Sequence, residues 1–265
     1  MKNIPSSNPD DWDSHWKHFF KLTEENPADL YRYNLLIDLL DINNDGSECN
    51  LIDLGCGDGA FISHFLKKYP RANIIGIDAS RTAIKRAKLA NPNAKFICMD
   101  LSAFNFIYPK KYFGWATHTI CSEVIEHLDN PNIFLKNAKY FLKKNSFLVL
   151  SVPGGPLSEF HLYIGHRQHF SKESISKLIL KSGYHISSIY RAGFPFFNLY
   201  RICTQLRGKK LLDDLGINRT ATSYVKHRSH LLYIAFSVFS KLFKFNLSNF
   251  PFGWQLIAKI RTNIS

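Results

Sequence analysis

The chain has 265 residues, of which 45% are hydrophobic, 14% aromatic and 21% charged. This composition is typical of a globular protein and excludes a disordered chain, a collagen and a coiled coil. The net charge is +13, from 34 basic and 21 acidic residues, which suits nucleic acid, anionic lipid or an anionic substrate, or else a lysine-rich solvated surface. A folded chain of this size buries roughly 75% of its unfolded surface, so we expect one domain with elaborations.

The cysteines and two further segments indicate in which compartment the protein is expected. The five cysteines are odd in number and form no C-x-x-C pair, which argues against a disulfide framework or a zinc knuckle and fits a reducing cytoplasm. Residues 1–20 contain three aspartates and two tryptophans and lack the apolar core of a signal peptide. The uncharged run 231–240 has ten residues, whereas a membrane span needs about 20. We therefore expect a cytoplasmic protein with no spanning helix.

Apolar runs of strand length alternate with helical patterns between residues 50 and 190. Strands separated by helices of about ten residues are typical of α/β proteins with a doubly wound parallel sheet. Ser80 and Ser171 are suited to cap two of the helices. The predicted strands are 51–54, 73–77, 95–99, one within 112–121, 146–152, 184–191 and 253–261, and the predicted helices are 60–69, 81–90, 132–142 and 172–181.

This pattern divides the chain into four segments. Residues 1–48 form a helical lead-in, residues 49–192 form the ligand-binding core, and residues 251–265 contain the last strand. Residues 193–250, called the aromatic segment below, interrupt the alternation before the sheet resumes. We expect a mostly parallel, seven-stranded, Rossmann-like sheet whose ligands bind outside the carboxyl ends of the strands.

The strongest local signal is Leu51-Ile52-Asp53-Leu54-Gly55-Cys56-Gly57-Asp58-Gly59-Ala60, a strand that runs into a glycine turn and then a helix. Glycines permit positive φ angles and a close approach of the backbone to a ligand. The start of the helix offers unpaired N–H groups. Gly55, Gly57 and Ala60 also satisfy the dinucleotide fingerprint G-x-G-x-x-G/A, so this motif alone leaves the cofactor open.

Three acids narrow the choice of cofactor. Asp53, two residues before Gly55, would repel a pyrophosphate but can attract an ammonium group. Asp78 ends the second strand, where a carboxylate can accept from both ribose hydroxyls. Asp100 follows the third strand and can accept from an adenine amine. A ligand with an amino acid head, a ribose and an adenine is S-adenosylmethionine.

At these residues the chain resembles the class I S-adenosylmethionine-dependent methyltransferases, over roughly residues 48–192. Ser122-Glu123-Val124-Ile125-Glu126-His127-Leu128 resembles the E-x-x-E-H segment of the branch that includes the ubiquinone-biosynthesis O-methyltransferases, and so does Asn26-Pro27-Ala28-Asp29-Leu30-Tyr31-Arg32 in the lead-in. The resemblance implies that Arg32 holds the cofactor carboxylate. The predicted cofactor-binding residues are Arg32, Asp53, Gly55, Gly57, Asp58, Asp78, Ala79, Asp100, Leu101, Ser122 and Val124.

Histidines are the candidate catalytic residues. Methyl transfer depends mainly on positioning, and a hydroxyl nucleophile benefits from a general base, for which histidine has a suitable pKa. His127 follows the fourth strand, and His166 and His169 lie in Gly165-His166-x-x-His169-Phe170-Ser171, which is similar to a segment of small-molecule methyltransferases. Each of the three could instead order its loop. No third ligand has clear spacing, so we expect no metal site.

Other side chains are candidates for the acceptor site. Glu123 either lines the substrate pocket or stabilises the start of a helix through its negative charge. Phe196 and Phe197 are expected to line a pocket for a greasy acceptor. Trp12 and Trp16 form either a face that packs on the core or a lid over the ligands. Residues 230–245 are apolar nearly all round and suit a buried helix, a dimer interface or a helix on a membrane surface.

We therefore predict an S-adenosylmethionine-dependent methyltransferase that acts on an oxygen or nitrogen of a small, apolar or anionic molecule. The alternative is a nucleic-acid or protein methyltransferase that uses the basic surface, although no dedicated nucleic-acid module is visible. A non-catalytic, cofactor-binding partner subunit is a third hypothesis, against which the intact glycine turn and the three acids argue. A monomer or a homodimer is expected, and peripheral contact with a membrane stays open.

Overall fold

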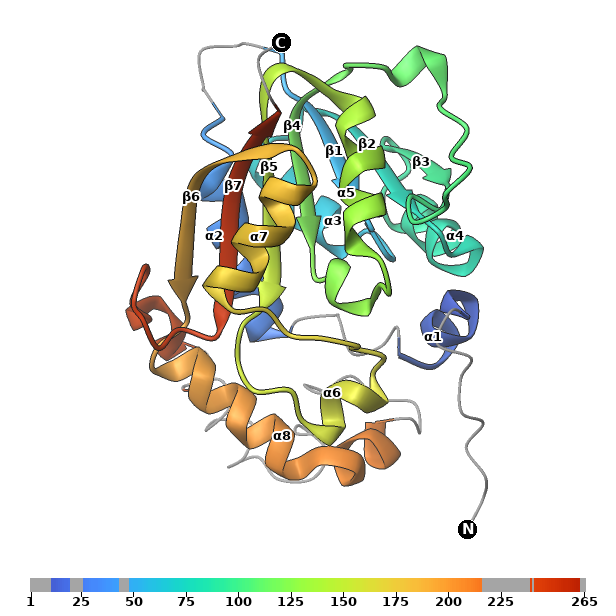
Figure 1. Ribbon diagram of the computed structural model, residues 1–265. Helices are drawn as coiled ribbons and strands as arrows, with labels where there is room; N and C mark the ends of the chain where they lie inside the picture. Colours follow the sequence, from blue (N-terminus) through green and yellow to red (C-terminus); the bar gives the residue numbers. More distant parts are fainter. Residues whose placement is uncertain (1–10, 20–25, 43–47, 216–238, 240, 263–265) are drawn as a thin grey trace.

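The computed structural model describes residues 11–19, 26–42, 48–215, 239 and 241–262. Seven strands form one sheet in the order β3-β2-β1-β4-β5-β7-β6, with helices on both of its faces (Figure 1). All neighbours pair in parallel except β7, which runs antiparallel between β5 and β6. The strands are β1 Asn50–Leu54, β2 Asn73–Asp78, β3 Lys95–Cys98, β4 Ala116–Ser122, β5 Leu142–Pro153, β6 Tyr184–Ala192 and β7 Gln255–Thr262. The predicted fold class is confirmed.

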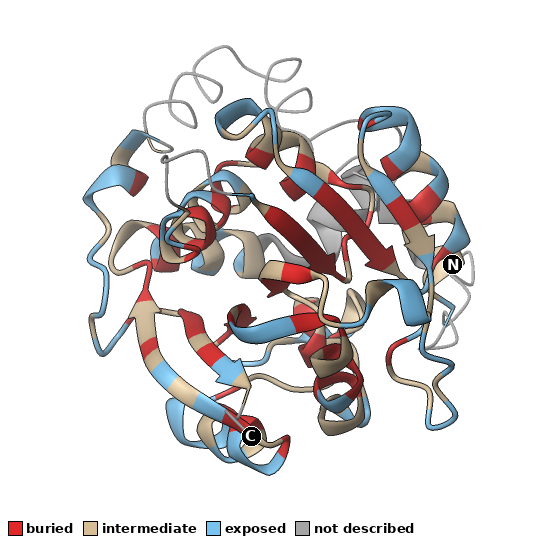
Figure 2. Ribbon diagram, turned by 90° about the horizontal axis from the view of Figure 1, so that it is seen from above, coloured by how far each residue is buried: buried red, intermediate tan, exposed pale blue. Residues whose placement is uncertain are grey.

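The helices cover both faces because the central strands are apolar on both sides. All five residues of β1 are buried, and buried residues are concentrated in the central strands (Figure 2). One core cluster lies between the sheet and α5 and α7, and a second lies between the sheet and α2, α3 and α4. The helices are α1 Trp12–Phe19, α2 Pro27–Leu39, α3 Ala60–Lys68, α4 Arg81–Ala90, α5 Pro131–Ala138, α6 Glu159–Tyr163, α7 Lys172–Lys181 and α8 Phe196–Leu215, with 3-10 turns η2 Lys110–Tyr112, η3 Ile125–His127, η4 Lys139–Phe141 and η5 Leu242–Phe245.

Two predicted boundaries are wrong. The helix predicted to reach residue 142 ends at Ala138, and the 3-10 turn η4 connects it to β5. Strand β5 therefore begins at Leu142 rather than at residue 146. Leu142 pairs with Ala116 of β4, so its apolar side chain belongs to the sheet rather than to the helix. The short helix α6 was not predicted, because five residues show no helical periodicity.

The aromatic segment returns to the domain at the carboxyl ends of the parallel strands. Helix α8 lies below the ends of β5 and β6 in Figure 1, and α6 packs beside it. Phe194 forms a β-bridge with Leu247, and the Asn246 side chain accepts hydrogen bonds from the N–H groups of Phe196 and Phe197 at 2.8 and 3.1 Å. The two ends of the segment are thereby held together. Most of the apolar run 230–245 lies outside the described residues.

Candidate functional site

One cavity of about 830 Å³ lies at the carboxyl ends of β1, β2, β3 and β4. This is where an open α/β sheet binds its ligands. The cavity is within the size range of small-molecule pockets. All the residues predicted to bind the cofactor line it, namely Arg32, Asp53, Gly55, Gly57, Asp58, Asp78, Ala79, Asp100, Leu101, Ser122 and Val124.

The glycine turn between β1 and α3 has a backbone that side chains would not tolerate. Gly55, Gly57 and Gly59 have φ angles of 76°, 55° and 82°, all in the left-handed region. A Cβ on Gly55 would overlap the side chain of Val124, and one on Gly57 would overlap the ring of Trp16. The turn therefore presents bare backbone to the cavity, as the close approach of a cofactor requires.

The acids at the strand ends are buried and carry raised pKa values. Burial, assisted by the charge of Asp78, raises the pKa of Asp53 to about 8. Asp78 accepts hydrogen bonds from the N–H groups of Gly57 (2.9 Å) and Ser80 (2.8 Å), yet burial still raises its pKa to about 6. A ligand ammonium beside Asp53 would favour its charged form, so this site fits the amino acid head of S-adenosylmethionine.

Asp100 has a different environment, because it is exposed at the rim of the cavity. Its Oδ1 atom accepts hydrogen bonds from the N–H and the hydroxyl group of Ser102, at 2.8 and 2.6 Å. These two bonds fix the carboxylate at the end of β3. That orientation is compatible with the predicted contact to an adenine amine.

Arg32 of α2 reaches the cavity from the lead-in and is paired with two acids. Its guanidinium lies 2.8 Å from Asp29 and 3.8 Å from Glu123. Burial alone would lower the pKa of Arg32, but the two carboxylates raise it above its usual value. Glu123 has a φ of 55° and accepts a hydrogen bond from Gln255 Nε2 at 2.9 Å, so its position is fixed by β7 as well.

Helix α1 forms the outer wall of the cavity. Trp12, Asp13 and Trp16 all line it. Asp13 Oδ1 accepts hydrogen bonds from Ser80 Oγ (2.6 Å) and from the N–H of Thr82 (2.8 Å), which attaches α1 to the start of α4. Of the two interpretations of the tryptophans, this arrangement favours the one in which they cover the ligand site.

His127 lies in the cavity wall, on the turn η3 after β4. Its Nδ1 atom lies 3.0 Å from the carbonyl oxygen of Gly165. Because a carbonyl oxygen only accepts, Nδ1 carries the proton and Nε2 carries the lone pair of the neutral ring. Burial lowers the pKa of His127 to about 4, so the ring is neutral at physiological pH.

His166 and His169 lie near His127 but are not among the residues that line the cavity, so of the two interpretations of these histidines the structure favours the one in which they order their loop. The ring centroids of His127 and His166 are 4.6 Å apart. His169 Nδ1 donates to the carbonyl oxygen of Gly155 (2.6 Å), so its Nε2 accepts from Nδ1 of His166 (3.0 Å). Burial lowers the pKa of both rings. Their bonds order the loop between β5 and α7.

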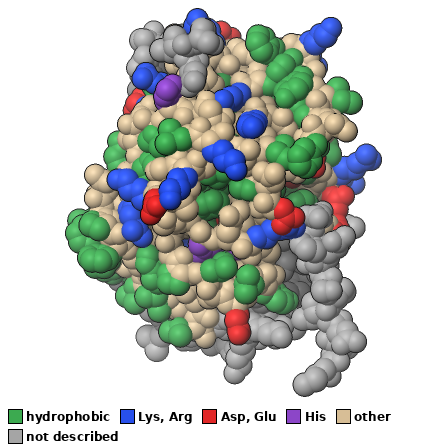
Figure 3. Space-filling model, in the orientation of Figure 1, with side chains coloured by type: hydrophobic (Ala, Val, Ile, Leu, Met, Phe, Trp, Pro, Cys, Tyr) green, Lys and Arg blue, Asp and Glu red, His purple; other side chains and the backbone are tan. Residues whose placement is uncertain are grey.

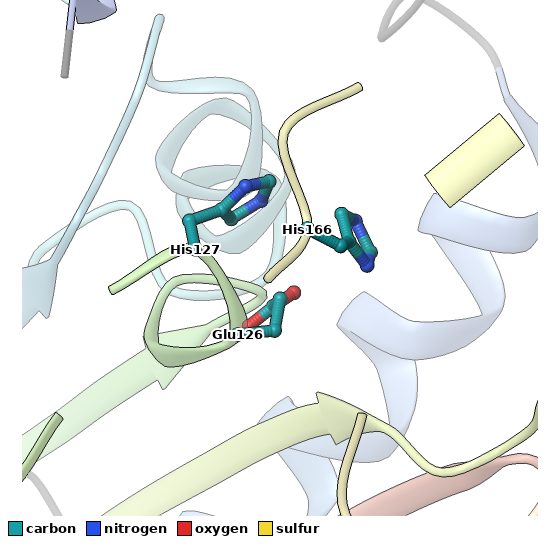
Figure 4. Close-up of side chains that lie close together, drawn as sticks. All are labelled: Glu126, His127 and His166. Atoms are coloured by element: carbon teal, nitrogen blue, oxygen red, sulfur yellow. The ribbon is translucent and has the colours of Figure 1, made fainter. Parts of the chain in front are cut away.

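Glu126, His127 and His166 are the group of described residues that could hold a metal ion. One donor atom from each lies within 4.8 Å of the others, and the Glu126 carboxyl group lies between the two imidazole rings (Figure 4). Both carboxyl oxygens of Glu126 are buried without a hydrogen-bond partner. Burial, followed by the charge of Glu123, raises the pKa of Glu126 well above its usual value. A proton on the carboxyl group is therefore the alternative to a bound metal ion. The expectation that no metal binds stays a prediction.

Phe196 and Phe197 do not line the cavity, so the predicted pocket-lining role needs correction. Phe197 is 1% exposed and packs in a small cluster with Ala28 and Phe243. Its ring centroid lies 5.6 Å from that of Tyr31 in the lead-in. The two phenylalanines attach the aromatic segment to the lead-in, which sequence reasoning did not foresee because the contact joins distant parts of the chain.

Lysine and arginine side chains are spread over the face seen in Figure 3. Of the seven basic residues between 201 and 228, the structure describes the side chain of Arg201 alone. No helix among the described residues is long and apolar enough to cross a membrane.

Comparisons with known proteins identify the family of the chain. The family described as "Methyltransferase domain" matches residues 22–189. A tRNA (guanine-N(7)-)-methyltransferase of Rubrobacter xylanophilus is 34% identical over 116 residues, which are 40% of this chain and 48% of that protein. A ubiquinone biosynthesis O-methyltransferase of Pelagibacter ubique is 28% identical over 111 residues, covering 42% and 44%. The chain thus spans less than half the length of these relatives.

Solved structures share the fold. A Haloferax volcanii methyltransferase, in complex with its activator Trm112, has a TM-score of 0.58 and 12% identity, covering 96% of this chain and 95% of that one. A phosphoethanolamine N-methyltransferase of Haemonchus contortus, in complex with S-adenosylhomocysteine, has a TM-score of 0.55 and 14% identity, covering 88% and 52%. Since the family match extends over more than half of the sequence, the chain belongs to the methyltransferase-domain family.

Proposed function

We propose that this protein transfers the methyl group of S-adenosylmethionine to an oxygen or nitrogen atom of a small molecule. The observation that carries the proposal is the position of His127, a neutral histidine in the wall of the cavity that the predicted cofactor residues also line. A base thus lies within the same enclosed space as the cofactor site. A cavity of about 830 Å³ with α1 in its wall suits a small acceptor beside the cofactor.

Different residues of the cavity bind the cofactor and accept the proton of the nucleophile. S-adenosylmethionine supplies, when bound, a methyl group activated by a positively charged sulfur. Asp53 would pair with its ammonium group, Arg32 with its carboxylate, and Asp78 with its ribose hydroxyls, since all three residues line the cavity. His127 Nε2 accepts the proton of a hydroxyl nucleophile as its oxygen attacks the methyl group, or first takes a proton from an ammonium group to leave the amine that attacks, while the bond from Nδ1 to Gly165 holds the ring in place. Since the methyl group is already activated, positioning contributes most of the rate.

Among the relatives, the ubiquinone-biosynthesis enzyme and a trans-aconitate 2-methyltransferase of Enterobacter, 40% identical over 73 residues, are named for small acceptors. Such names support a small acceptor here, either apolar or anionic. We further propose that the protein works in the cytoplasm, as a monomer or homodimer.

A second candidate is methylation of nucleic acid or protein. The net charge of +13 and the tRNA methyltransferase among the relatives favour it. In that case a base or side chain, rather than a free molecule, would enter the cavity beside His127.

The two candidates separate in one experiment. A cell extract is divided by ultrafiltration into small molecules and macromolecules, and each fraction is incubated with the protein and methyl-labelled S-adenosylmethionine. We expect label in the small-molecule fraction, reduced about 100-fold or more by His127→Asn, as general bases contribute 10²–10⁴-fold. The control is His185→Asn, at an exposed position on β6. Label only in RNA or protein would contradict the proposal.

A further inference from the structure

The loop between β3 and β4, residues 99–115, exposes large apolar side chains. Of the five most exposed large hydrophobic residues among those that the structure describes, three lie in this loop, namely Phe104, Ile107 and Phe113, at 84%, 87% and 72%. Single exposed apolar residues are normal on a soluble protein, whereas a concentration of them marks an interaction site. Apolar side chains gather over this loop at the upper right of Figure 3, where Figure 1 draws the loop in green.

Hydrogen bonds and packing fix the loop to the domain. Asn137 of α5 donates to the carbonyl oxygens of Leu101 and Ala103, at 2.8 and 3.1 Å. Its Oδ1 atom accepts from the hydroxyl group of Tyr108 at 3.0 Å. Phe106 turns inward and packs against the core. The loop therefore presents its other apolar side chains to solvent in a fixed arrangement.

Two of the loop's rings lie on the same surface as the start of β5. The ring centroids of Tyr108 and Phe113 lie 4.5 and 5.1 Å from that of Tyr140. Gly114 follows Phe113, and a Cβ on it would lie 4.0 Å from the Cα atom of Lys143. Tyr108, Phe113 and the exposed Lys143 thus belong to one continuous surface.

This surface is basic. The two stretches of sequence that form it, residues 101–122 and 130–158, contain no acidic residue and no arginine but six lysines. Lys110 and Lys111 are exposed and precede Phe113 in the loop. Among the described residues, no carboxylate forms an ion pair with Lys110, Lys111 or Lys143. Exposed apolar side chains are therefore combined with positive charge on one face.

We propose that the loop between β3 and β4 binds the surface of an anionic lipid membrane. Ile107 and Phe113 enter the headgroup region, and the lysines attract the negative headgroups, since both terms contribute to binding at a membrane surface. Phe104 of the same loop lines the cavity, so the loop connects the docking surface with the ligand site. The proposal holds for any methyl acceptor and does not rest on the proposed function.

The side chains favour lipid over nucleic acid. All six basic residues of the two stretches are lysines, whereas arginine is the residue suited to forked recognition of phosphate and bases. Ile107 is the most exposed apolar side chain of the loop. An aliphatic chain has no ring on which a base could stack, but it is well suited to the apolar part of a bilayer.

Binding to vesicles tests the proposal. The whole chain, saturated with S-adenosylhomocysteine, is mixed with vesicles of phosphatidylcholine alone or of equal parts phosphatidylcholine and phosphatidylglycerol. Cosedimentation gives the bound fraction. We expect binding to the anionic vesicles to be about 10-fold or more tighter than to the neutral ones, and to weaken as sodium chloride is added.

Variants of the loop separate the apolar from the electrostatic contribution. Ile107→Ser and Phe113→Ser should each weaken binding to the anionic vesicles about 10-fold, because an apolar side chain no longer enters the bilayer. Lys111→Gln should weaken it about fivefold through the lost charge.

Matched controls lie on α4, which covers the opposite face of the sheet from α5. Leu89 is 78% exposed and Lys88 is also exposed, and Leu89→Ser and Lys88→Gln should leave vesicle binding unchanged. Each variant is first shown to bind S-adenosylhomocysteine as the wild type does.

Three results would overturn the proposal. The first is no binding of the wild type to the anionic vesicles, or equal binding to both kinds. The second is an unchanged affinity in Ile107→Ser, Phe113→Ser and Lys111→Gln. The third is a dimer, seen by analytical ultracentrifugation without lipid, that Phe113→Ser dissociates, because the surface would then bind a second copy of the chain.

Discussion

The indole ring of Trp16 lies directly against Gly57, so closely that a Cβ on the glycine would overlap carbons of the ring. Gly57 also donates its N–H to Asp78 Oδ2 at 2.9 Å. Helix α1 therefore covers the part of the glycine turn where the cofactor is expected to lie.

Gly57→Ala is expected to abolish binding of S-adenosylhomocysteine, because the new methyl group would collide with the ring of Trp16 and stand on the face of the turn that the cofactor approaches. Calorimetric titration measures this. Gly114→Ala is a matched control, since Gly114 has a φ of 58°, close to the 55° of Gly57, but no atom closer than 3.9 Å to an added Cβ. Both variants carry about 1–2 kcal/mol of backbone strain, and similar affinities in the two would contradict a cofactor at this turn.

Trp16→Ala is expected to speed dissociation of S-adenosylhomocysteine about 10-fold or more, because an aromatic wall of the cavity contributes about 1.5–3 kcal/mol. Stopped-flow fluorescence after mixing with excess unlabelled competitor gives the rate. Asp13→Ala should act in the same direction, since it releases α1 from Ser80 and Thr82. Dissociation slower than in the wild type would mean that Trp16 competes with the cofactor.

The raised pKa of Asp53 predicts a pH dependence of stability. With a folded-state pKa of about 8, above the ordinary 3.8, the folded protein holds this proton more tightly than the unfolded chain. The stabilisation is full below pH 4 and is lost as the pH rises through 8. Between pH 7 and 9 the free energy of unfolding should fall by about 1 kcal/mol more in the ligand-free wild type than in Asp53→Asn. Urea denaturation at both pH values measures it, and parallel curves would contradict the assignment.

Chelation tests the occupant of the group formed by Glu126, His127 and His166. Because burial raises the pKa of Glu126, a proton on its carboxyl group can remove its charge without a metal ion. We expect elemental analysis to find no stoichiometric metal, and methyl transfer to survive dialysis against a chelator. Activity that is lost on dialysis and restored by a divalent cation, but not in His166→Ala, would show a metal site instead.

The site residues that could be predicted from the strand pattern lie at the carboxyl ends of strands. Asp53 and Asp78 lie at the carboxyl ends of β1 and β2, and Asp100 follows β3. In a parallel sheet these ends meet at one edge. Their convergence on one cavity follows from the strand pattern alone. The glycine turn is predicted by its local motif, and Arg32 by the resemblance of the lead-in to the family.

The remaining part of the site depends on contacts between distant segments. Asp13 caps α4, and Phe197 packs on Tyr31 of the lead-in. Arg201 of α8 donates to His161 of α6, 40 residues away in the sequence. No periodicity or spacing in the sequence specifies such pairs, which is why the contact of Phe197 with the lead-in cannot be predicted from the sequence.

The most direct test of the account is calorimetric titration of the wild type and Asp78→Ala with S-adenosylhomocysteine. The carboxylate of Asp78 is held by the N–H groups of Gly57 and Ser80 at the end of β2. Loss of its charge-assisted bonds to a ribose should weaken binding by about 1.5–3 kcal/mol, or roughly 10- to 150-fold. We predict one-to-one binding by the wild type and that loss in the variant. No binding by the folded wild type, or an unchanged affinity in folded Asp78→Ala, would contradict the assignment of this cavity to the cofactor.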